Sequence, residues 1–236
     1  MSVNNSCDST LLLLRDFDIF QHITDEEYQE LGLIHNYIEA GNGEYIYFPQ
    51  QNRNRLYFTK EGFIKLGYID EAGNEVIKEI IQKGEVFGQF TLERNNNLDE
   101  FAQAYKSHVS LCAFTIEDFM RLLQRKPKMA IAFSFHLGNK LRKVENRLLN
   151  ILNKDVKSRL AQLFLQLAND NHAIQDNCAT IEKFLTHEDI AKLIGASRQT
   201  VTTTLNQFEK QGLIKVSKDN FTITDVAMLK KAGDAG

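Results

Sequence analysis

The spacing of apolar residues changes about halfway along this chain of 236 residues. Between residues 36 and 114, short alternating or aromatic runs follow one another at roughly ten-residue intervals, as strands do. Beyond Pro127 the apolar residues instead step by four and three, which is the heptad spacing of a long helix. We therefore predict an α+β chain in which a domain of strands leads into a helix.

The strand-like region contains runs rich in β-branched and aromatic residues, with glycine or asparagine between them. The runs are 44–48, 55–59, 63–69 and 76–81, and the separators are 41–43, Glu61-Gly62, 70–74 and 83–85. This pattern predicts a β-sandwich or barrel, with a hairpin loop in which Gly73 or Asn74 takes positive φ. Before it, residues 18–33 are expected to form short helices, with Thr24 as an N-cap.

A heptad stripe marks the long helix. Its apolar positions are Leu137, Leu141, Val144, Leu148 and Ile151. A helix of this length cannot bury such a stripe in one small barrel, so we predict that it pairs with the same helix of a second chain. The alternative is that the stripe packs on the chain's own barrel. A shorter helix, capped by Thr115 and running to Leu123, is expected just before it.

Two short helices joined by a glycine turn are expected from Leu185 onward. Thr186 caps the first helix, with Asp189 three residues later in a capping-box arrangement, and Ser197 caps the second. Gly195 gives the backbone the freedom that a sharp turn needs. The apolar faces are Ile190, Leu193 and Ile194, then Val201, Leu205 and Phe208. This order is that of a helix-turn-helix, for which an ordinary helical hairpin is the alternative.

The segments on either side of this motif are less regular. Asp155 is expected to cap a helix over residues 156–167, and the polar segment 169–183 is predicted to be the least structured part of the chain. Residues 211–216 and 221–224 are expected to form two short strands around a polar turn, which makes a small β-wing.

The outer face of the second motif helix has the chemistry of a DNA reader. Its side chains are Arg198, Gln199, Thr202, Thr203 and Asn206, with no carboxylate among them. Arginine suits guanine, glutamine suits adenine, and threonine can bond a base edge or touch a thymine methyl group. Phosphate contacts are expected from Ser197, Lys210, Lys215 and Lys218, and Thr186 is a further candidate DNA-binding residue. The alternative for each lysine is a solvated surface charge.

Charge is distributed unevenly between the two halves of the chain. The net charge is −3, but residues 1–136 carry 13 Lys and Arg against 20 Asp and Glu, whereas residues 137–236 carry 15 against 11. We expect only the C-terminal half to meet phosphate. No apolar run of membrane-spanning length and no signal-peptide pattern occurs, which favours a cytoplasmic protein without a membrane partner.

The three cysteines, Cys7, Cys112 and Cys178, are far apart and form no CxxC pair. Their spacing gives no support to a zinc or iron–sulfur site. Buried or incidental thiols are the favoured interpretation, and a redox-active Cys7 is the alternative.

The segment 185–201, followed by Gly212-Leu213-Ile214, resembles the Crp/Fnr superfamily of bacterial transcription regulators. The segments 155–161 and 83–89 share the resemblance, which covers residues 18–230. It implies a cyclic-nucleotide-binding-like double-stranded β-helix over 1–126, a dimerisation helix over 127–153 and a winged helix-turn-helix over 154–236. It also implies a homodimer that contacts RNA polymerase, recognises a pseudo-palindromic site in double-stranded DNA and is controlled by an effector in the barrel.

The chain departs from the family pattern in the reader helix. Many members carry Glu where this chain has Gln199, and Arg where it has Thr203. Only Arg198 is carried over, as a guanine contact. We therefore expect a half-site that differs from the known ones.

The expected effector pocket departs further. Its candidate residues are Gly84, Phe87, Gly88, Gln89, Arg94, Glu100 and Phe101. Gln89 stands where a cyclic-nucleotide binder has its ribose glutamate, and Glu100 stands where the phosphate-binding arginine is expected. A carboxylate there would repel the anion, so we do not expect cyclic AMP, although Arg94 lies nearby.

Other cofactors of the family are also not expected. An iron–sulfur cluster lacks its N-terminal cysteines, and a haem would need a histidine ligand. The candidates for that ligand are His22, His35, His108 and His136. The effector thus stays unassigned.

Two other functions compete with a regulator that is not an enzyme. One is a metal-binding barrel enzyme fused to a nucleic-acid module, for which the candidates His35 and His108 lack a neighbouring HxH motif or paired carboxylate. The other is a signalling protein with a degenerate DNA-binding domain.

Overall fold

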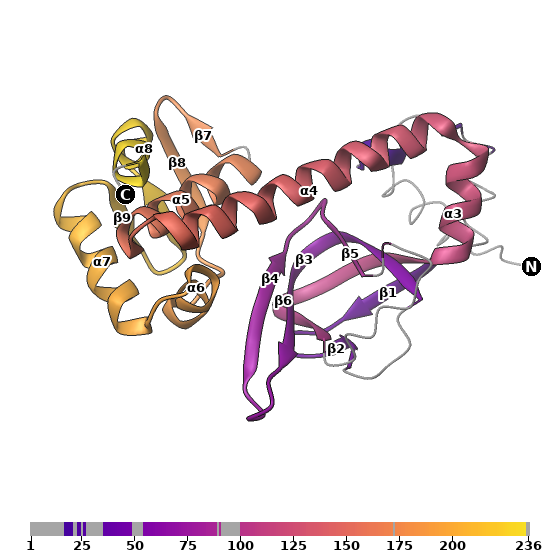
Figure 1. Ribbon diagram of the computed structural model, residues 1–236, viewed down its shortest axis with the longest axis horizontal. Coiled ribbons are helices and arrows are strands. Elements are labelled where there is room, and N and C mark those ends of the chain that lie inside the picture. The colour runs from indigo at the N-terminus through magenta and orange to yellow at the C-terminus, as the bar shows by residue number, and fades with distance from the viewer. Residues whose placement is uncertain are drawn as a thin grey trace, which may run out of the picture. The chain divides into compact units, whose positions relative to one another are not determined.

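The computed structural model describes residues 17–20, 23–24, 26, 35–48, 54–88, 90, 100–171 and 173–234. The chain divides into two compact units, Met1–Lys140 and Leu141–Gly236. The boundary between them falls inside one long helix, α4 (Pro127–Asn153), which begins at the expected proline (Figure 1). The described part of the chain contains no helix long and apolar enough to cross a membrane.

The N-terminal unit is built on a curled antiparallel sheet (Figure 1). Its order is β1-β6-β3-β4, with β2 paired to β6 and β5 paired to β3. The strands are β1 (His35–Ala40), β2 (Tyr45–Tyr47), β3 (Arg55–Ile69), β4 (Glu75–Ile81), β5 (Val86–Gly88) and β6 (Glu100–Thr115). Together with the helical second unit, this sheet confirms the predicted α+β class.

Strand β3 corrects the predicted break at Glu61-Gly62. It runs unbroken through both residues, and its pairing with β6 shifts register on either side of Glu61. Gly62 has a φ of +82°, and a Cβ there would collide with the carbonyl oxygen of His108. The glycine therefore marks a bulge that bends a long strand, not a turn between two strands.

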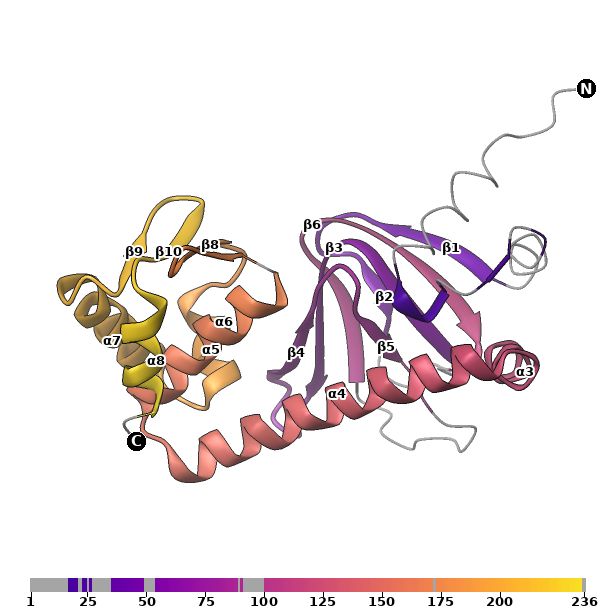
Figure 2. The same cartoon turned by 90° about the horizontal axis from the view of Figure 1, so that it is seen from above.

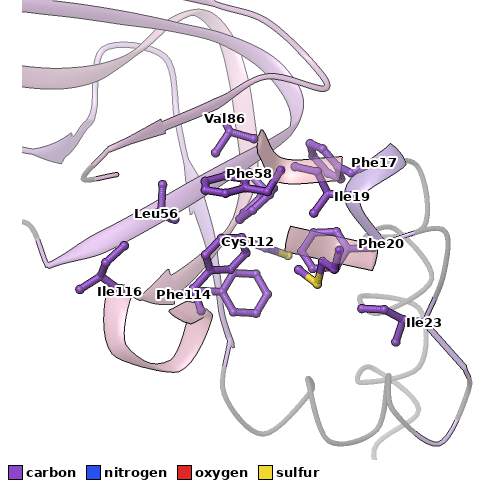
Figure 3. Packing of buried hydrophobic residues seen from close by; sticks show 13 residues of the cluster. Phe17, Ile19, Phe20, Ile23, Leu56, Phe58, Val86, Cys112, Phe114 and Ile116 are labelled. Atoms are coloured by element: carbon purple, nitrogen blue, oxygen red, sulfur yellow. The ribbon is translucent and has the colours of Figure 1, made fainter. Parts of the chain in front are cut away.

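The two faces of the sheet bury different side chains, because neighbours along a strand point to opposite sides. Tyr57 belongs to an inner cluster, whereas Leu56 and Phe58 belong to an outer one. The outer cluster joins the sheet to the 3-10 helix η2 (Asp18–Phe20), to α3 (Ile116–Arg125) and to the start of α4. Its members are Phe17, Ile19, Phe20, Ile23, Leu56, Phe58, Val86, Cys112, Phe114, Ile116, Phe119, Met129 and Phe133 (Figure 3).

The helical expectations in this unit are met where the structure describes them. Thr115 caps α3 by accepting from the Asp118 backbone N–H at 3.1 Å. Gly73 takes a φ of +83° in the hairpin loop. Of the helices expected over 18–33, the structure shows η2 and a helical residue at Glu26. Residues 25 and 27–34 lie outside the described residues, so the expected capping role of Thr24 stays a prediction.

The C-terminal unit packs helices on a small sheet of order β7-β8-β10-β9 (Figures 1 and 2). Its strands are β7 (Ile174–Gln175), β8 (Cys178–Glu182), β9 (Ile214–Val216) and β10 (Asn220–Ile223). Its helices, after the end of α4, are α5 (Val156–Asp170), α6 (His187–Ile194), α7 (Arg198–Lys210) and α8 (Val226–Asp234). Asp155 caps α5 as expected, by accepting from Ser158 N at 2.7 Å.

The prediction that 169–183 is the least structured segment is wrong. The segment contains the end of α5 and the hairpin β7–β8, whose turn residues Asp176 and Asn177 have φ of +45° and +67°. Two positive φ values in a two-residue turn match the twist of an antiparallel hairpin. In β8 only Ala179 and Ile181 are buried, so the apolar signal was too sparse to find.

Candidate DNA interface and sensor site

The first helix of the predicted motif begins with a complete capping box. Thr186 Oγ1 accepts from Asp189 N at 3.1 Å, and the Asp189 carboxylate accepts from Thr186 N at 2.9 Å. The carboxylate also accepts from the Thr186 hydroxyl. These bonds satisfy donors that a helix start would otherwise leave unpaired. Thr186 remains exposed, as a DNA contact requires.

The turn into α7 also has the predicted geometry. Gly195 ends α6 in the left-handed region, with φ of 64° and ψ of 52°, which a residue with a side chain adopts only at a cost. Ser197 then caps α7 by accepting from Thr200 N at 3.1 Å. Val201, Leu205 and Phe208 are buried, and so are Ile190 and Ile194, whereas Leu193 is half-buried.

The opposite face of α7 presents the predicted reader side chains to solvent. Arg198, Gln199, Thr203 and Asn206 are exposed, and Thr202 is half-buried. The first turn of α7 contains no acidic residue. The one carboxylate on this helix, Glu209, lies near its C-terminal end and accepts from Val216 N at 2.9 Å. The face is therefore polar, cationic at Arg198, and free of a group that repels phosphate.

The two threonines of this face differ in what they can offer. Thr202 Oγ1 donates to the carbonyl oxygen of Arg198 at 2.9 Å and lies 2.9 Å from His187 Nδ1, so its bonding capacity is largely used. Thr203 makes no side-chain hydrogen bond to the residues that the structure describes. Of the two base contacts expected for threonine, the methyl contact suits Thr202, and a hydrogen bond suits Thr203.

The wing forms as predicted, between β9 and β10. Lys210, Lys215 and Lys218 are all exposed on or beside it. Sequence reasoning missed Lys183, whose Nζ donates to Ser217 O at 3.2 Å and lies 5.5 Å from the centre of the Phe221 ring. Lys183 thereby ties the wing turn to the chain before α6. The polar segment 169–183 gave no signal of this role.

Two arginines that the sequence reasoning did not select hold the end of α6. Arg147 Nε on α4 donates to Leu193 O at 3.1 Å, and an Arg159 guanidinium nitrogen on α5 donates to Gly195 O at 3.2 Å. A second Arg159 nitrogen donates to Ile151 O at 3.2 Å. Positive groups are favourable at a helix C-terminus because its carbonyl oxygens carry partial negative charge.

The predicted effector residues fall into three groups in the N-terminal unit. Gln89 and Arg94 lie outside the described residues. Gly84 and Gly88 have φ of +86° and +105°, and a Cβ at Gly88 would collide with Arg55 O. Phe87 and Phe101 are buried. Glycines at these positions are therefore required by the backbone itself, whether or not a ligand approaches them.

Tyr47 connects Phe87 to Glu100 on the inner face of the sheet. Its ring centre lies 6.3 Å from that of Phe87, and its hydroxyl donates to Glu100 at 2.9 Å. Tyr57 stacks on Phe87 at 4.9 Å. Lys78 Nζ lies 2.8 Å from the Glu100 carboxylate. The sequence reasoning missed Tyr47, Tyr57 and Lys78, because residues as far apart as 47 and 100 meet only through strand pairing.

Among the described residues, the side chains around Glu100 do not fit a cyclic nucleotide phosphate. The position expected to hold an arginine carries Glu100, whose carboxylate is already engaged by Tyr47 and Lys78. An anion would have to displace Lys78 from its ion pair and approach a carboxylate.

Metal and thiol candidates give no further site. Among the described residues, no group of three His, Cys, Asp or Glu side chains could hold a metal ion. His108 lies 3.9 Å from Glu39, and the side chain of His35 is outside the described residues, as are His22 and Cys7. Burial raises the pKa of the Cys112 thiol to about 11, and Cys178 is exposed. A thiol with so high a pKa is a poor nucleophile at neutral pH.

The heptad stripe of α4 lies mostly uncovered. Leu137 packs against the outer cluster of the N-terminal unit. The side chains of Leu141, Val144, Leu148 and Ile151 are 60%, 58%, 56% and 42% exposed. Apolar side chains in such a row are typical of a surface that another chain covers.

Comparisons with known proteins assign both parts of the chain. Residues 38–126 match the cyclic nucleotide-binding domain, and residues 158–232 match the Crp-like helix-turn-helix domain. The chain is 29% identical over 179 residues to the global nitrogen regulator of Nostoc sp. (strain PCC 7120), covering 75% of this chain and 80% of that protein. It is 28% identical over 159 residues to the cAMP-activated global transcriptional regulator CRP of Pasteurella multocida, covering 67% of this chain and 76% of that protein.

Solved structures agree on the fold. A CRP/FNR-family transcriptional regulator from Thermus thermophilus superposes with a TM-score of 0.65 at 23% identity, covering 84% of this chain and 98% of that one. A mutant of CooA from Carboxydothermus hydrogenoformans superposes with a TM-score of 0.70 at 24% identity, covering 84% and 88%. The relatives are named as regulators and not as enzymes, and the capped helix α7 of the motif is present here in full. The chain belongs to the Crp/Fnr superfamily and is a DNA-binding transcription regulator.

Proposed function

We propose that the regulator is a homodimer that binds a pseudo-palindromic operator by inserting α7 of each subunit into a major groove. The observation that carries this proposal is the outer face of α7, where Arg198, Gln199 and Thr203 are exposed and no acidic residue occurs in the first turn. Paired reader helices must stand about 34 Å apart to meet successive major grooves.

Dimer pairing is proposed through α4. The exposed row Leu141, Val144, Leu148 and Ile151 supports it, because four large apolar side chains in water are unfavourable until another surface covers them. In this arrangement residues 1–126 sense, 127–153 dimerise and 154–236 bind DNA. The positive charge of the C-terminal half supports contact with DNA. The dimer would act in the cytoplasm, and RNA polymerase would be its protein partner on the DNA.

The effector is proposed to be something other than cyclic AMP, although one relative is named as cAMP-activated. The support is Glu100, which occupies the expected phosphate position and is paired with Lys78 at 2.8 Å. A phosphate site that lacks its arginine and contains a carboxylate would lose binding free energy, because the carboxylate repels the phosphate and no arginine compensates.

Selection of bound duplexes from random DNA, with and without cell extract, tests the proposal. We expect an inverted repeat whose half-sites are about 10–10.5 base pairs apart or a multiple of it. Sedimentation of the wild type and of Leu148→Glu tests the dimer, with Leu148→Met as the matched control. A wild type that stays monomeric, or that binds no duplex at low salt, would overturn the proposal.

A further inference from the structure

A hydrogen-bonded chain joins the two helices of the motif at His187. Thr202 Oγ1 donates to Arg198 O at 2.9 Å and lies 2.9 Å from His187 Nδ1. A threonine hydroxyl has one proton to donate and two lone pairs to accept with. Because the proton goes to Arg198 O, the bond to His187 requires a proton on Nδ1. The imidazole is thus held by Nδ1, and Nε2 is the nitrogen that gains or loses a proton.

The second ring nitrogen is available to a ligand. Nε2 of His187 makes no hydrogen bond to the residues that the structure describes, and the side chain is half-buried. Neutral imidazole with its proton on Nδ1 has only a lone pair on Nε2, which cannot donate to a phosphate oxygen. Protonated imidazole offers an N–H and a positive charge at the same atom.

The charges around His187 are those of an incomplete anion site. Partial burial lowers the pKa of His187, and the nearby cations Lys183, before α6, and Arg198, at the start of α7, lower it further. On its own helix, Asp189 is engaged with Thr186 and Glu188 is exposed. An anion placed among Lys183, His187 and Arg198 would offset the repulsion that these two cations exert on a protonated imidazole.

We propose that His187 is a proton-gated contact to a DNA phosphate, so that DNA binding takes up a proton and strengthens as the pH falls. Protonated Nε2 donates to a phosphate oxygen, while Nδ1 stays on Thr202. The proton comes from solvent, and no other bond changes. This inference rests on the proposed function, because it needs α7 to lie in the major groove beside that phosphate.

The direction of the pH effect follows from linkage. A phosphate beside the imidazole raises the pKa of His187 in the complex above its value in the free protein. Affinity then rises as the pH falls through the pKa of the complex, and it levels off below the pKa of the free protein. Each phosphate contact also makes the negative slope of log affinity against log salt concentration steeper by about 0.9. The contact of His187 does so only at low pH, where the imidazole is protonated.

The test measures the affinity of full-length protein for a duplex selected from random DNA, between pH 5.5 and pH 8.5, at several salt concentrations. The variants are H187Q, which cannot titrate, and H108Q, which removes an exposed histidine of the N-terminal unit. We expect the wild type and H108Q to gain about tenfold more affinity than H187Q between the highest and lowest pH, the size of one charge-assisted hydrogen bond. Their salt slope should also steepen by about one at low pH.

A second measurement keeps the result independent of folding. The imidazole of His187 is titrated by NMR in the free protein and with the duplex bound, and we expect the pKa to rise on binding. If H187Q shows the same pH and salt dependence as the wild type while both bind the duplex tightly, this inference is wrong and the proposed function stands. If no variant binds a duplex at any pH, both fail together.

Discussion

The two units of this regulator build their candidate sites in different ways. In the C-terminal unit, the contacts that set the reader helix are local: Thr186 bonds to Asp189 and Ser197 to Thr200, each three residues apart. In the N-terminal unit, Tyr47 reaches Glu100 across 53 residues of sequence. A site fixed by local caps is visible in a sequence, whereas one fixed by strand pairing depends on the register of the whole sheet.

The largest expected effect tests whether the two units fold independently. Phe164 on α5 is fully buried, with its ring centre 5.0 Å from that of Phe221 on β10. Phe164→Ala should destabilise the C-terminal unit by about 3–5 kcal/mol and abolish DNA binding. Two calorimetric transitions, of which only one moves, would support independent units. A common shift of all unfolding signals would show that the two units unfold as one cooperative structure.

The next effect tests the long-range character of the N-terminal unit. Gly62 and Gly43 both have positive φ, +82° and +85°, but only at Gly62 would a Cβ collide with another strand. Gly43→Ala should cost about 1 kcal/mol for backbone strain. Gly62→Ala should cost about 1–3 kcal/mol more, because the β3–β6 bulge must open. Denaturant unfolding of the pair measures the difference, and equal losses would argue against a bulge held by the partner strand.

A comparable effect on function is expected at Arg198. Arg198→Ala should weaken specific operator binding by about 1–3 kcal/mol and relax the preference at one base position. The Lys215→Ala variant is the contrast, since a phosphate contact should weaken all duplexes alike and lower the salt slope by about one. Competition binding to single-base variants of the operator separates the two. If Arg198→Ala keeps the wild-type preference among the operator variants, this residue does not read a base.

The smallest effect is the acid sensitivity of the helix caps. Hydrogen bonds from Ser158 lower the pKa of Asp155 from 3.8, and bonds from Met228 and Asn177 lower that of Asp225. Because these pKa values are depressed on folding, the stabilisation is complete above pH 3.8 and is lost as the pH falls through the folded values. Asp155→Asn should lessen the fall in melting temperature below that pH, as circular dichroism would record. If the melting temperature of the variant falls with pH as that of the wild type does, the Asp155 cap does not contribute to the acid sensitivity.

The sequence predicted most of the geometry of the candidate DNA interface and little of that of the candidate sensor site, and the reason is physical. Capping residues and the left-handed Gly195 act within one helical turn, so their spacing in the sequence is enough to predict the two helices and the turn between them. The β7–β8 hairpin was not predicted because only two of its residues are buried. The β3 bulge was not predicted because Gly62 has the same sequence context as a turn glycine. The Tyr47–Glu100–Lys78 group depends on three strands that meet in space.

The arginine contacts at the end of α6 bear on how such a regulator can evolve. Arg147 and Arg159 hold the carbonyl oxygens of Leu193 and Gly195, which are atoms that every amino acid supplies. Substitution along α6 therefore cannot remove these two acceptor atoms, and neither contact involves an outward-facing side chain of α7. New operators can be acquired while the mechanical linkage between α4, α5 and the motif is inherited unchanged.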